Sequence, residues 1–168
     1  MREIAYVGPA FSVVKEYARS RAGKFQYDMI LHPNSAVIIP LLDKNTIVME
    51  MEYRIPIKKY VYELPAGKMN RGERPEEGAM RELLEETGYK AGSLKLLFKA
   101  YTAPGLETEV LYFYIATNLS KGARKLDPDE MIDVKKVKIR DAIKMVKNNK
   151  IEDTKTVAGL LFYKTFAH

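Results

Sequence analysis

The first 35 residues alternate between apolar and polar side chains with the two-residue period of β-strands. Strands are predicted over 3–8 and 10–18, and Gly8-Pro9 separates them. A third strand is predicted after a turn at 21–23. The residues that alternate in it are Phe25, Tyr27, Met29 and Leu31. Residues 1–35 are therefore expected to form an N-terminal antiparallel strand segment.

A second group of strands is predicted further along the chain. Residues 37–42 form a continuous apolar run, which is typical of a strand buried on both faces. A turn at 43–45 then leads into the next strand. The strands predicted after this turn are 46–52, 60–63, 94–102, 109–117 and one near 131–138.

Three helices are predicted, one in the middle of the chain and two at its end. The middle helix is expected from Pro75 to Thr87, because proline is tolerated in a first turn and Gly88 can end a helix. The last two are expected at about 140–148 and 153–166. Strands dominate the first two thirds of the chain. The sequence thus predicts an α+β or α/β fold in which a mixed sheet lies between helices.

The middle helix carries three carboxylates within one turn and a half, at Glu82, Glu85 and Glu86. They are expected on one side of the helix, facing solvent, because each residue advances by about 100°. The residues expected to pack on the core are Met80, Leu83, Leu84 and Thr87. Like charges at this spacing repel, each pair by roughly 0.2–0.5 kcal/mol. A bound cation would neutralise them, and oxygen ligands suit a hard ion such as Mg²⁺.

The composition is that of one ordinary globular domain. The chain has 168 residues, of which 46% are hydrophobic and 30% charged, and it has no cysteine. Disulfides and thiolate metal sites are therefore excluded, which fits a cytoplasmic protein. No apolar run approaches the roughly 18 residues that span a bilayer, and the first residues do not resemble a signal peptide. No membrane association is expected.

The chain is basic, with a formal net charge of +6. Most of the excess lies in a cluster without interleaved aromatic residues: Lys135, Lys136, Lys138, Arg140, Lys144, Lys147 and Lys150. Bases would have no aromatic ring to stack on, so we interpret this cluster as a solvated helix face and expect no nucleic acid partner. A positive field can still attract a small anionic substrate.

Residues 67–89 contain nine positions that form a pattern of defined residue types at defined spacing. They are Gly67, Glu73, Arg81, Glu82, Leu83, Glu85, Glu86, Gly88 and Tyr89. Except at Tyr89, where an aliphatic residue is usual, this pattern matches the Nudix box. The chain therefore resembles the Nudix hydrolases, which cleave nucleoside diphosphates linked to another moiety with a bound divalent metal. The resemblance implies the α/β/α sandwich of that family for residues 36–168, as a catalytic domain.

Other segments resemble the Nudix members that hydrolyse ADP-ribose to AMP and ribose 5-phosphate. Residues 52–54 (Glu-Tyr-Arg) match a Gln-Tyr-Arg segment of that subfamily, with Glu52 in place of the glutamine. Residues 63–67 (Glu-Leu-Pro-Ala-Gly) match a second segment. Pro104 lies fifteen residues after Tyr89, about where that subfamily carries a marker proline.

The resemblance also implies roles for individual residues. Mg²⁺, or Mn²⁺ in its place, would be bound by Glu82, Glu86, Glu85 and the carbonyl of Ala66. The general base would be Glu109, with Glu107 as the fallback, and Glu85 would be a partner in activating water. The residues implied in substrate binding are Arg54, Pro104, Gly105 and Leu106. Arg81 is expected to organise the carboxylates by ion pairing.

Two alternatives to ADP-ribose hydrolysis stay open. The substrate could be another nucleoside diphosphate sugar or a dinucleotide, because the box itself does not separate these substrates. The chain could also be a nucleotide-binding module that does not cleave, although such modules are expected to lose box glutamates. The subfamily resemblance further implies a homodimer in which residues 1–35 reach across to the partner.

Overall fold

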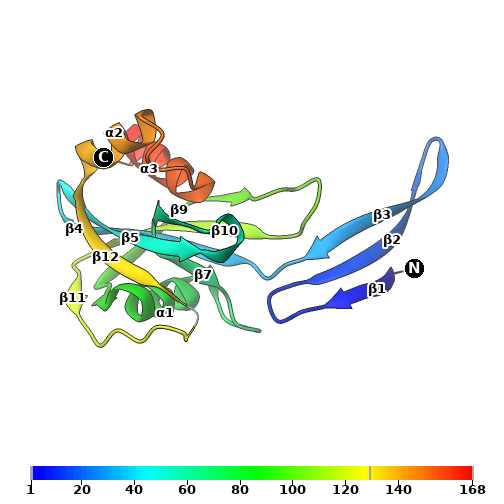
Figure 1. Cartoon of the computed structure of the whole chain (residues 1–168), viewed down its shortest axis with the longest axis horizontal. Helices are drawn as coiled ribbons and strands as arrows, with labels where there is room; N and C mark the ends of the chain where they lie inside the picture. Colours follow the sequence, from blue (N-terminus) through cyan, green and yellow to red (C-terminus); the bar gives the residue numbers. More distant parts are fainter. Residues whose placement is uncertain (1, 129, 168) are drawn as a thin grey trace.

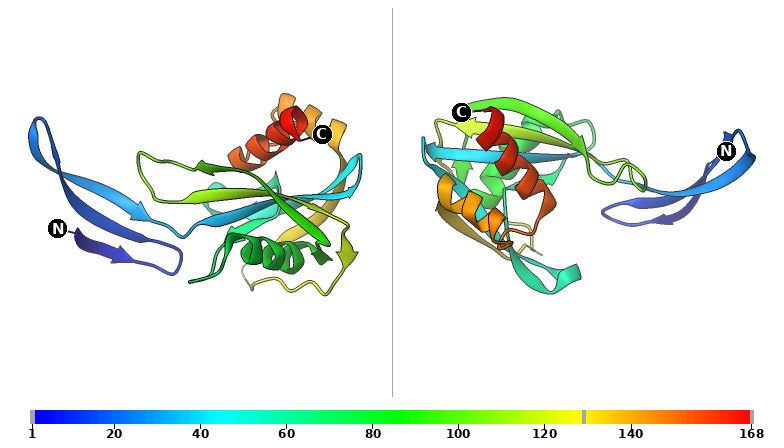
Figure 2. Two further views of the ribbon diagram at one scale, coloured as in Figure 1. Left: turned by 180° about the vertical axis from the view of Figure 1, so that it is seen from behind. Right: turned by 90° about the horizontal axis from the view of Figure 1, so that it is seen from above.

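The computed structural model describes residues 2–128 and 130–167, which form a layered body and a projecting N-terminal sheet (Figure 1). The projecting sheet is antiparallel, in the order β1-β2-β3. Its strands are β1 (Arg2–Val7), β2 (Ser12–Ser20) and β3 (Gly23–Leu31). The predicted N-terminal strand segment is thus present, and it extends away from the body in all three views (Figure 2).

The body is built on a seven-stranded mixed sheet with the main order β12-β5-β4-β10-β9. The pairing of β10 with β4 is parallel, and the other pairings are antiparallel. The main strands are β4 (Ser35–Asp43), β5 (Thr46–Arg54), β9 (Ser93–Tyr101), β10 (Val110–Thr117) and β12 (Ile132–Lys138). The mixed sheet that the sequence predicted is confirmed.

The sheet divides beside β4, and this division shapes the site. The β4–β5 hairpin is paired only near its turn, at Leu41↔Ile47 and Asp43↔Thr46. Beyond that point β6 (Lys59–Glu63) pairs with β5, while β7 (Ala66–Lys68) pairs with β4. A 3-10 turn, η1 (Ile55–Ile57), joins β5 to β6. No strand was predicted at β7, and this strand exists because it pairs with β4, an element distant in sequence.

Helices cover both faces of the sheet. Helix α1 (Pro75–Thr87) lies on one face, and α2 (Ile139–Lys147) and α3 (Thr154–Phe166) lie on the other (Figure 1). A small two-stranded sheet of β8 (Tyr89–Lys90) and β11 (Ser120–Lys121) adjoins the end of α1. The Nudix α/β/α sandwich and all three predicted helices are therefore confirmed, within one or two residues at their ends.

Strand β4 supplies both hydrophobic cores because its side chains alternate between the two faces. Ala36 and Ile38 pack on the α1 side with Leu83. Val37 and Ile39 pack on the other side, in the core that includes α3. This explains the continuous apolar run in the sequence. Among the described residues, no helix has the length and apolar character needed to cross a membrane.

The orientation of α1 differs from the expectation in one respect. Leu83 and Thr87 are buried as predicted, but Met80 is 44% exposed. Glu82 and Glu86, which we expected to face solvent, are only 8% and 3% exposed. The expectation was wrong because it took apolar residues to define the buried side, whereas this helix turns two carboxylates toward the interior.

Candidate active site

Helix α1 is held at both ends by local interactions. Pro75 occupies its first turn, and the backbone amide of Arg74 donates to Oε2 of Glu77 (3.1 Å). At the other end Gly88 takes the left-handed conformation (φ 71°), and its amide donates to the carbonyl of Leu84 (2.9 Å). These contacts define where the helix begins and ends. The packing of Leu83 with Ala36 and Ile38 of β4 then orients the helix and its carboxylates.

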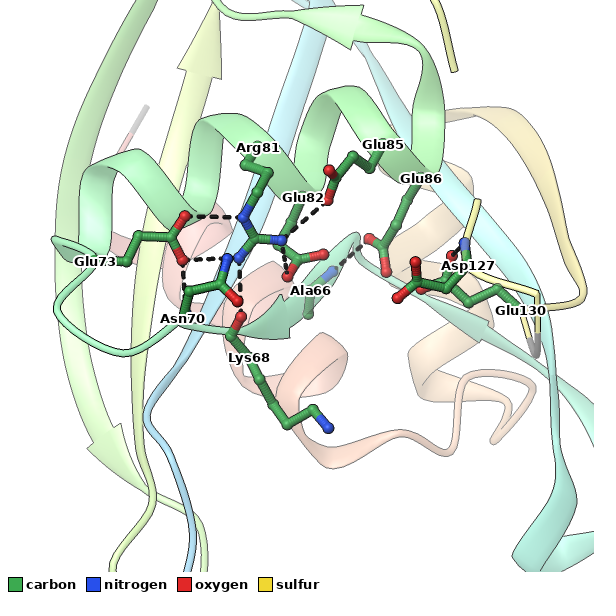
Figure 3. A network of polar contacts seen from close by, with 10 residues as sticks. All are labelled: Ala66, Lys68, Asn70, Glu73, Arg81, Glu82, Glu85, Glu86, Asp127 and Glu130. Atoms are coloured by element: carbon green, nitrogen blue, oxygen red, sulfur yellow. Dashed lines mark hydrogen bonds and ion pairs between the residues drawn. The ribbon is translucent and has the colours of Figure 1, made fainter. Parts of the chain in front are cut away.

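Arg81 lies at the centre of the carboxylates of α1 (Figure 3). Its Nε and Nη2 bind Glu73 at 2.8 Å each, and its Nη1 binds Glu82 at 2.7 Å and Glu85 at 3.0 Å. Nη2 also donates to the carbonyl of Lys68 on β7 (2.9 Å). The hydrogen bonds from Arg81 lower the pKa of Glu73 to about 2. Arg81 thus organises the carboxylates by ion pairing, as expected.

Glu82 and Glu86 are packed against β7. Oε2 of Glu86 accepts a hydrogen bond from the amide of Ala66 (2.9 Å). A Cβ on Gly67 would lie 2.1 Å from Cδ of Glu82, so only glycine leaves room for this carboxylate. Burial raises the pKa of Glu82, and burial together with the charge of Glu50 raises the pKa of Glu86 well above its ordinary value. Both carboxylates are therefore held in buried positions that destabilise their charged forms.

Carboxylates from other elements surround Glu86. Glu50 and Glu52 lie on β5 and Glu63 on β6, and all three are buried. Asp127 and Glu130 come from the loop before β12 and lie beside Glu86 (Figure 3). Burial, followed by the charge of Glu52, raises the pKa of Glu50 to about 8. The site therefore concentrates negative charge from four parts of the chain.

This donor set fits a divalent cation. In the described part of the chain no three acidic or histidine side chains are already arranged around a metal position. Arg81 is paired with Glu82 and Glu85 instead. However, Oε1 of Glu50 is buried and has no hydrogen-bond partner there. A hard cation would neutralise Glu82 and Glu86 and lower the cost of keeping them buried.

The site also carries two cations. Arg54, at the end of β5, binds Glu63 through Nε and Nη2 at 2.7 Å each, and Nη2 also binds Glu52 at 2.8 Å. Lys155, in the first turn of α3, binds the same Glu63 and lies 3.0 Å from Asp153. Two cationic side chains are therefore bound to one buried carboxylate, that of Glu63.

Glu109 comes from the loop between β9 and β10. The hydroxyl of Ser35 donates to its Oε1, and Nδ1 of His32 lies 3.4 Å from the same oxygen. The loop is docked on β3, since the amide of Ile30 donates to the carbonyl of Leu106 (2.9 Å) and the amide of Thr108 donates to that of Ile30 (3.1 Å). The N-terminal sheet thus helps to position Glu109.

A cleft of about 1020 Å³ brings most of these groups together. The predicted site residues that line it are Arg54, Ala66, Glu82, Glu85, Glu86, Glu107 and Glu109. Pro104, Gly105 and Leu106 do not line the cleft in this single chain, and Leu106 is 52% exposed. Their assignment to substrate binding stays a prediction.

Several residues of the site were not found from the sequence. They are Ser35, Glu50, Glu63, Asp127, Glu130 and Lys155. One signal was available: Glu50 and Glu52 alternate with apolar residues in a predicted strand, which places both carboxylates on one face. The others approach the cleft through tertiary contacts that no local pattern indicates.

Comparison with known proteins agrees with this geometry. Residues 31–159 match the model of the NUDIX domain. The ADP-ribose pyrophosphatase of Bacillus subtilis (strain 168) is 36% identical over 137 residues, which are 80% of this chain and 74% of that protein. The methanol dehydrogenase activator of Bacillus methanolicus is 37% identical over 137 residues, with the same 80% and 74% coverage.

A solved structure shares the fold over almost the whole chain. It is described as an ADP compounds hydrolase, is 21% identical, and superposes with a TM-score of 0.86 over 98% of this chain and 90% of its own. The match includes the N-terminal sheet, because it leaves out only a few residues. With the box, the sandwich and the matched residues 31–159 all in agreement, the chain belongs to the Nudix family.

Proposed function

We propose that this protein hydrolyses ADP-ribose to AMP and ribose 5-phosphate in the presence of Mg²⁺. The observation that carries the proposal is the cleft in which the box carboxylates lie together with Arg54 and Glu109. The ADP-ribose pyrophosphatase of Bacillus subtilis supports this substrate, since its similarity extends over 80% of the chain. The presence of every box glutamate argues against a module that binds nucleotides without cleaving them.

The metal would be held by Glu82, Glu86 and the carbonyl of Ala66, with Glu85 beside them. Mg²⁺ bound there would neutralise charge on the pyrophosphate and lower the pKa of a bound water. Release of Arg81 from Glu82 and Glu85 would make their oxygens available. Glu73 accepts two hydrogen bonds from Arg81, so the arginine would remain bound to Glu73 after this release.

The protein's own groups would orient the substrate and move the proton. Arg54 has a planar fork suited to phosphate oxygens, and its Nη1 has no partner among the described residues. Glu109 would accept a proton from the attacking water while the P–O bond of the pyrophosphate breaks. The hydroxyl of Ser35 would hold Glu109 in position. Glu107 also lines the cleft and is the second candidate for the base.

The proposal is tested by product analysis with a panel of substrates. The protein is incubated with ADP-ribose, ADP-mannose, NADH and diadenosine polyphosphates, with Mg²⁺ or with EDTA, and the products are separated by chromatography. We expect AMP and ribose 5-phosphate from ADP-ribose, only with Mg²⁺, and a loss of at least 100-fold in Glu82→Gln. A tenfold or greater preference for a dinucleotide would contradict the substrate assignment.

We also propose that the protein is a homodimer formed through the N-terminal sheet. That sheet projects from the body (Figure 2). It exposes a set of large apolar side chains. They are Ile4, Tyr6, Val7, Phe11, Tyr17, Phe25 and Tyr27. A three-stranded sheet is marginal without a packing surface, and a partner copy would provide one.

A further inference from the structure

Two cations, Arg54 of β5 and Lys155 of α3, share one buried carboxylate beside the cleft. Glu63 is 2% exposed, and it binds both Arg54 and Lys155. Burial works to raise the pKa of Glu63, but the hydrogen bond from Arg54 and the charges of Lys155 and Arg54 outweigh it and lower the pKa. Glu63 is thus an ionised carboxylate that fixes two cations at adjacent positions.

The geometry leaves hydrogen-bond donors unused on both cations. Among the described residues, Arg54 engages acceptors only through Nε and Nη2, so the two N–H groups of Nη1 remain. Lys155 engages Glu63 and Asp153, and an ammonium group has three N–H donors. Within the described residues, three N–H donors of these two side chains therefore have no acceptor, and both side chains line the cleft.

Lys155 is held in place more firmly than a surface lysine. It is the second residue of α3, and its side chain is only 17% exposed. Asp153 caps the helix, since its Oδ2 accepts from the amide of Thr156 (2.9 Å) while its Oδ1 contacts Lys155. Thr156 in turn accepts from the amide of Leu64, next to Glu63 (2.8 Å). The start of α3 and the end of β6 therefore fix Lys155 relative to Glu63.

We propose that Lys155 is a substrate-binding residue, which together with Arg54 forms a two-cation site for the diphosphate of the substrate. The inference rests on the proposed function, because it takes a nucleoside diphosphate as the ligand. The diphosphate would contact the cation held by the α1 carboxylates and also Arg54 and Lys155, because all of these residues line one cleft. Glu63 is the positioning residue for both cations.

The test measures binding of ADP-ribose to the full-length protein by calorimetry in Ca²⁺ and in EDTA. Lys155→Met is expected to weaken binding about tenfold in both conditions, because it removes a charged hydrogen bond to phosphate. Lys155→Arg keeps the charge and should bind within about threefold of the unmodified protein. Lys59→Met is the matched control, since Lys59 is also paired with a glutamate, Glu152, but lies outside the cleft.

Unchanged affinity in Lys155→Met would overturn the proposal, and so would an equal loss in Lys59→Met. A lower melting temperature in Lys155→Met with unchanged affinity would show that Lys155 only stabilises Glu63. If Lys155→Met fails to fold, Lys155→Gln replaces it. ADP-mannose is titrated in parallel, because it carries the same diphosphate. Binding of ADP-ribose that depends on Lys155, without any hydrolysis in Mg²⁺, would overturn the proposed function and leave this inference standing.

Discussion

Gly67 shows how one missing side chain shapes the carboxylate site. Its Cα faces the carboxylate of Glu82 so closely that a methyl group would lie 2.3 Å from both Oε atoms. The atoms that would clash belong to the end of a side chain, so they can move while the backbone stays. A methyl group here should therefore displace Glu82 without unfolding the protein.

Gly67→Ala is expected to weaken metal binding at least tenfold while the melting temperature in EDTA stays nearly unchanged. The reason is that Glu82 must move away from the ion position, and a misplaced ligand contributes little. Titration with Mn²⁺ followed by electron paramagnetic resonance measures this directly. Gly105→Ala is the control, because nothing lies within 4 Å of a Cβ there. Equal Mn²⁺ affinity in the two variants would contradict the argument.

Glu50→Gln should stabilise the metal-free protein in a pH-dependent way. The pKa of Glu50 is raised from 4.5 to about 8 by burial and by the charge of Glu52. Its ionised form therefore costs stability that is absent below pH 4.5 and grows until the pH passes about 8. Glutamine removes this cost, which is on the order of 4–5 kcal/mol at pH 8.5 and about 1 kcal/mol at pH 5. Melting curves in EDTA check this, and a gain of equal size at both pH values would refute it.

At the scale of single residues, the sequence predicted that the carboxylates of α1 lie together. It did not predict which residues of other elements surround them. The spacing of Glu82, Glu85 and Glu86 placed them on one side because helix geometry is local. Whether that side was buried could not be seen, because it depends on β7 and β5 packing against it. Glu63 and Lys155 meet over 92 residues of chain, and only the fold brings them together.

At the scale of elements, α3 is joined to the sheet by a polar contact in an apolar core. Thr156 is completely buried, and its hydroxyl accepts the amide hydrogen of Leu64 at 2.8 Å. This amide lies between β6 and β7, where the chain leaves one strand before it enters the next. The contact therefore fixes the helix to the point at which the sheet divides.

Thr156→Val should destabilise the protein by about 1–3 kcal/mol, because it leaves the amide of Leu64 buried without an acceptor. Thr165→Val in the same helix is the matched control. The hydroxyl of Thr165 donates to the carbonyl of Leu161 on an exposed part of α3, and its loss should cost little. Urea unfolding of both variants provides the comparison. Equal midpoints would show that the buried contact contributes nothing.

The elements themselves were largely predictable from the sequence. The strands of the N-terminal sheet and the three helices followed from periodicity, and Pro75 and Gly88 marked the ends of α1. The strand β7 was missed because its three residues, Ala66–Lys68, carry no strand pattern and become a strand only by pairing with Ser35–Val37. Short edge pairings of this kind depend on the partner strand rather than on their own sequence.

At the scale of the whole molecule, the N-terminal sheet and the catalytic body are connected through the Glu109 loop. The hydroxyl of Tyr27 on β3 donates to the carbonyl of Gly105, and Ile30 bridges to Glu107. The position of the sheet therefore affects the loop that carries the proposed base. A partner that packs on the sheet would affect the same loop.

Light scattering at micromolar concentration should give a mass of about twice 19.2 kDa for the intact chain. Val7→Lys, at an exposed apolar position of β1, should shift the mass toward that of one chain and lower the activity with it. Lys44→Glu, in the turn between β4 and β5, is a charge control far from the N-terminal sheet. A fully active species of 19.2 kDa would contradict the proposed dimer.

Arg81 has a consequence for how the enzyme can be switched off and on. With Glu82 at 2.7 Å and Glu85 at 3.0 Å, the arginine already occupies part of the place a metal would take. Removal of the metal therefore leaves Glu82 and Glu85 paired with Arg81 instead of repelling each other, so we expect α1 to stay folded. Entry of the metal becomes an exchange between two cations. Activity lost to a chelator should thus return within the mixing time once the ion is restored, with no refolding step.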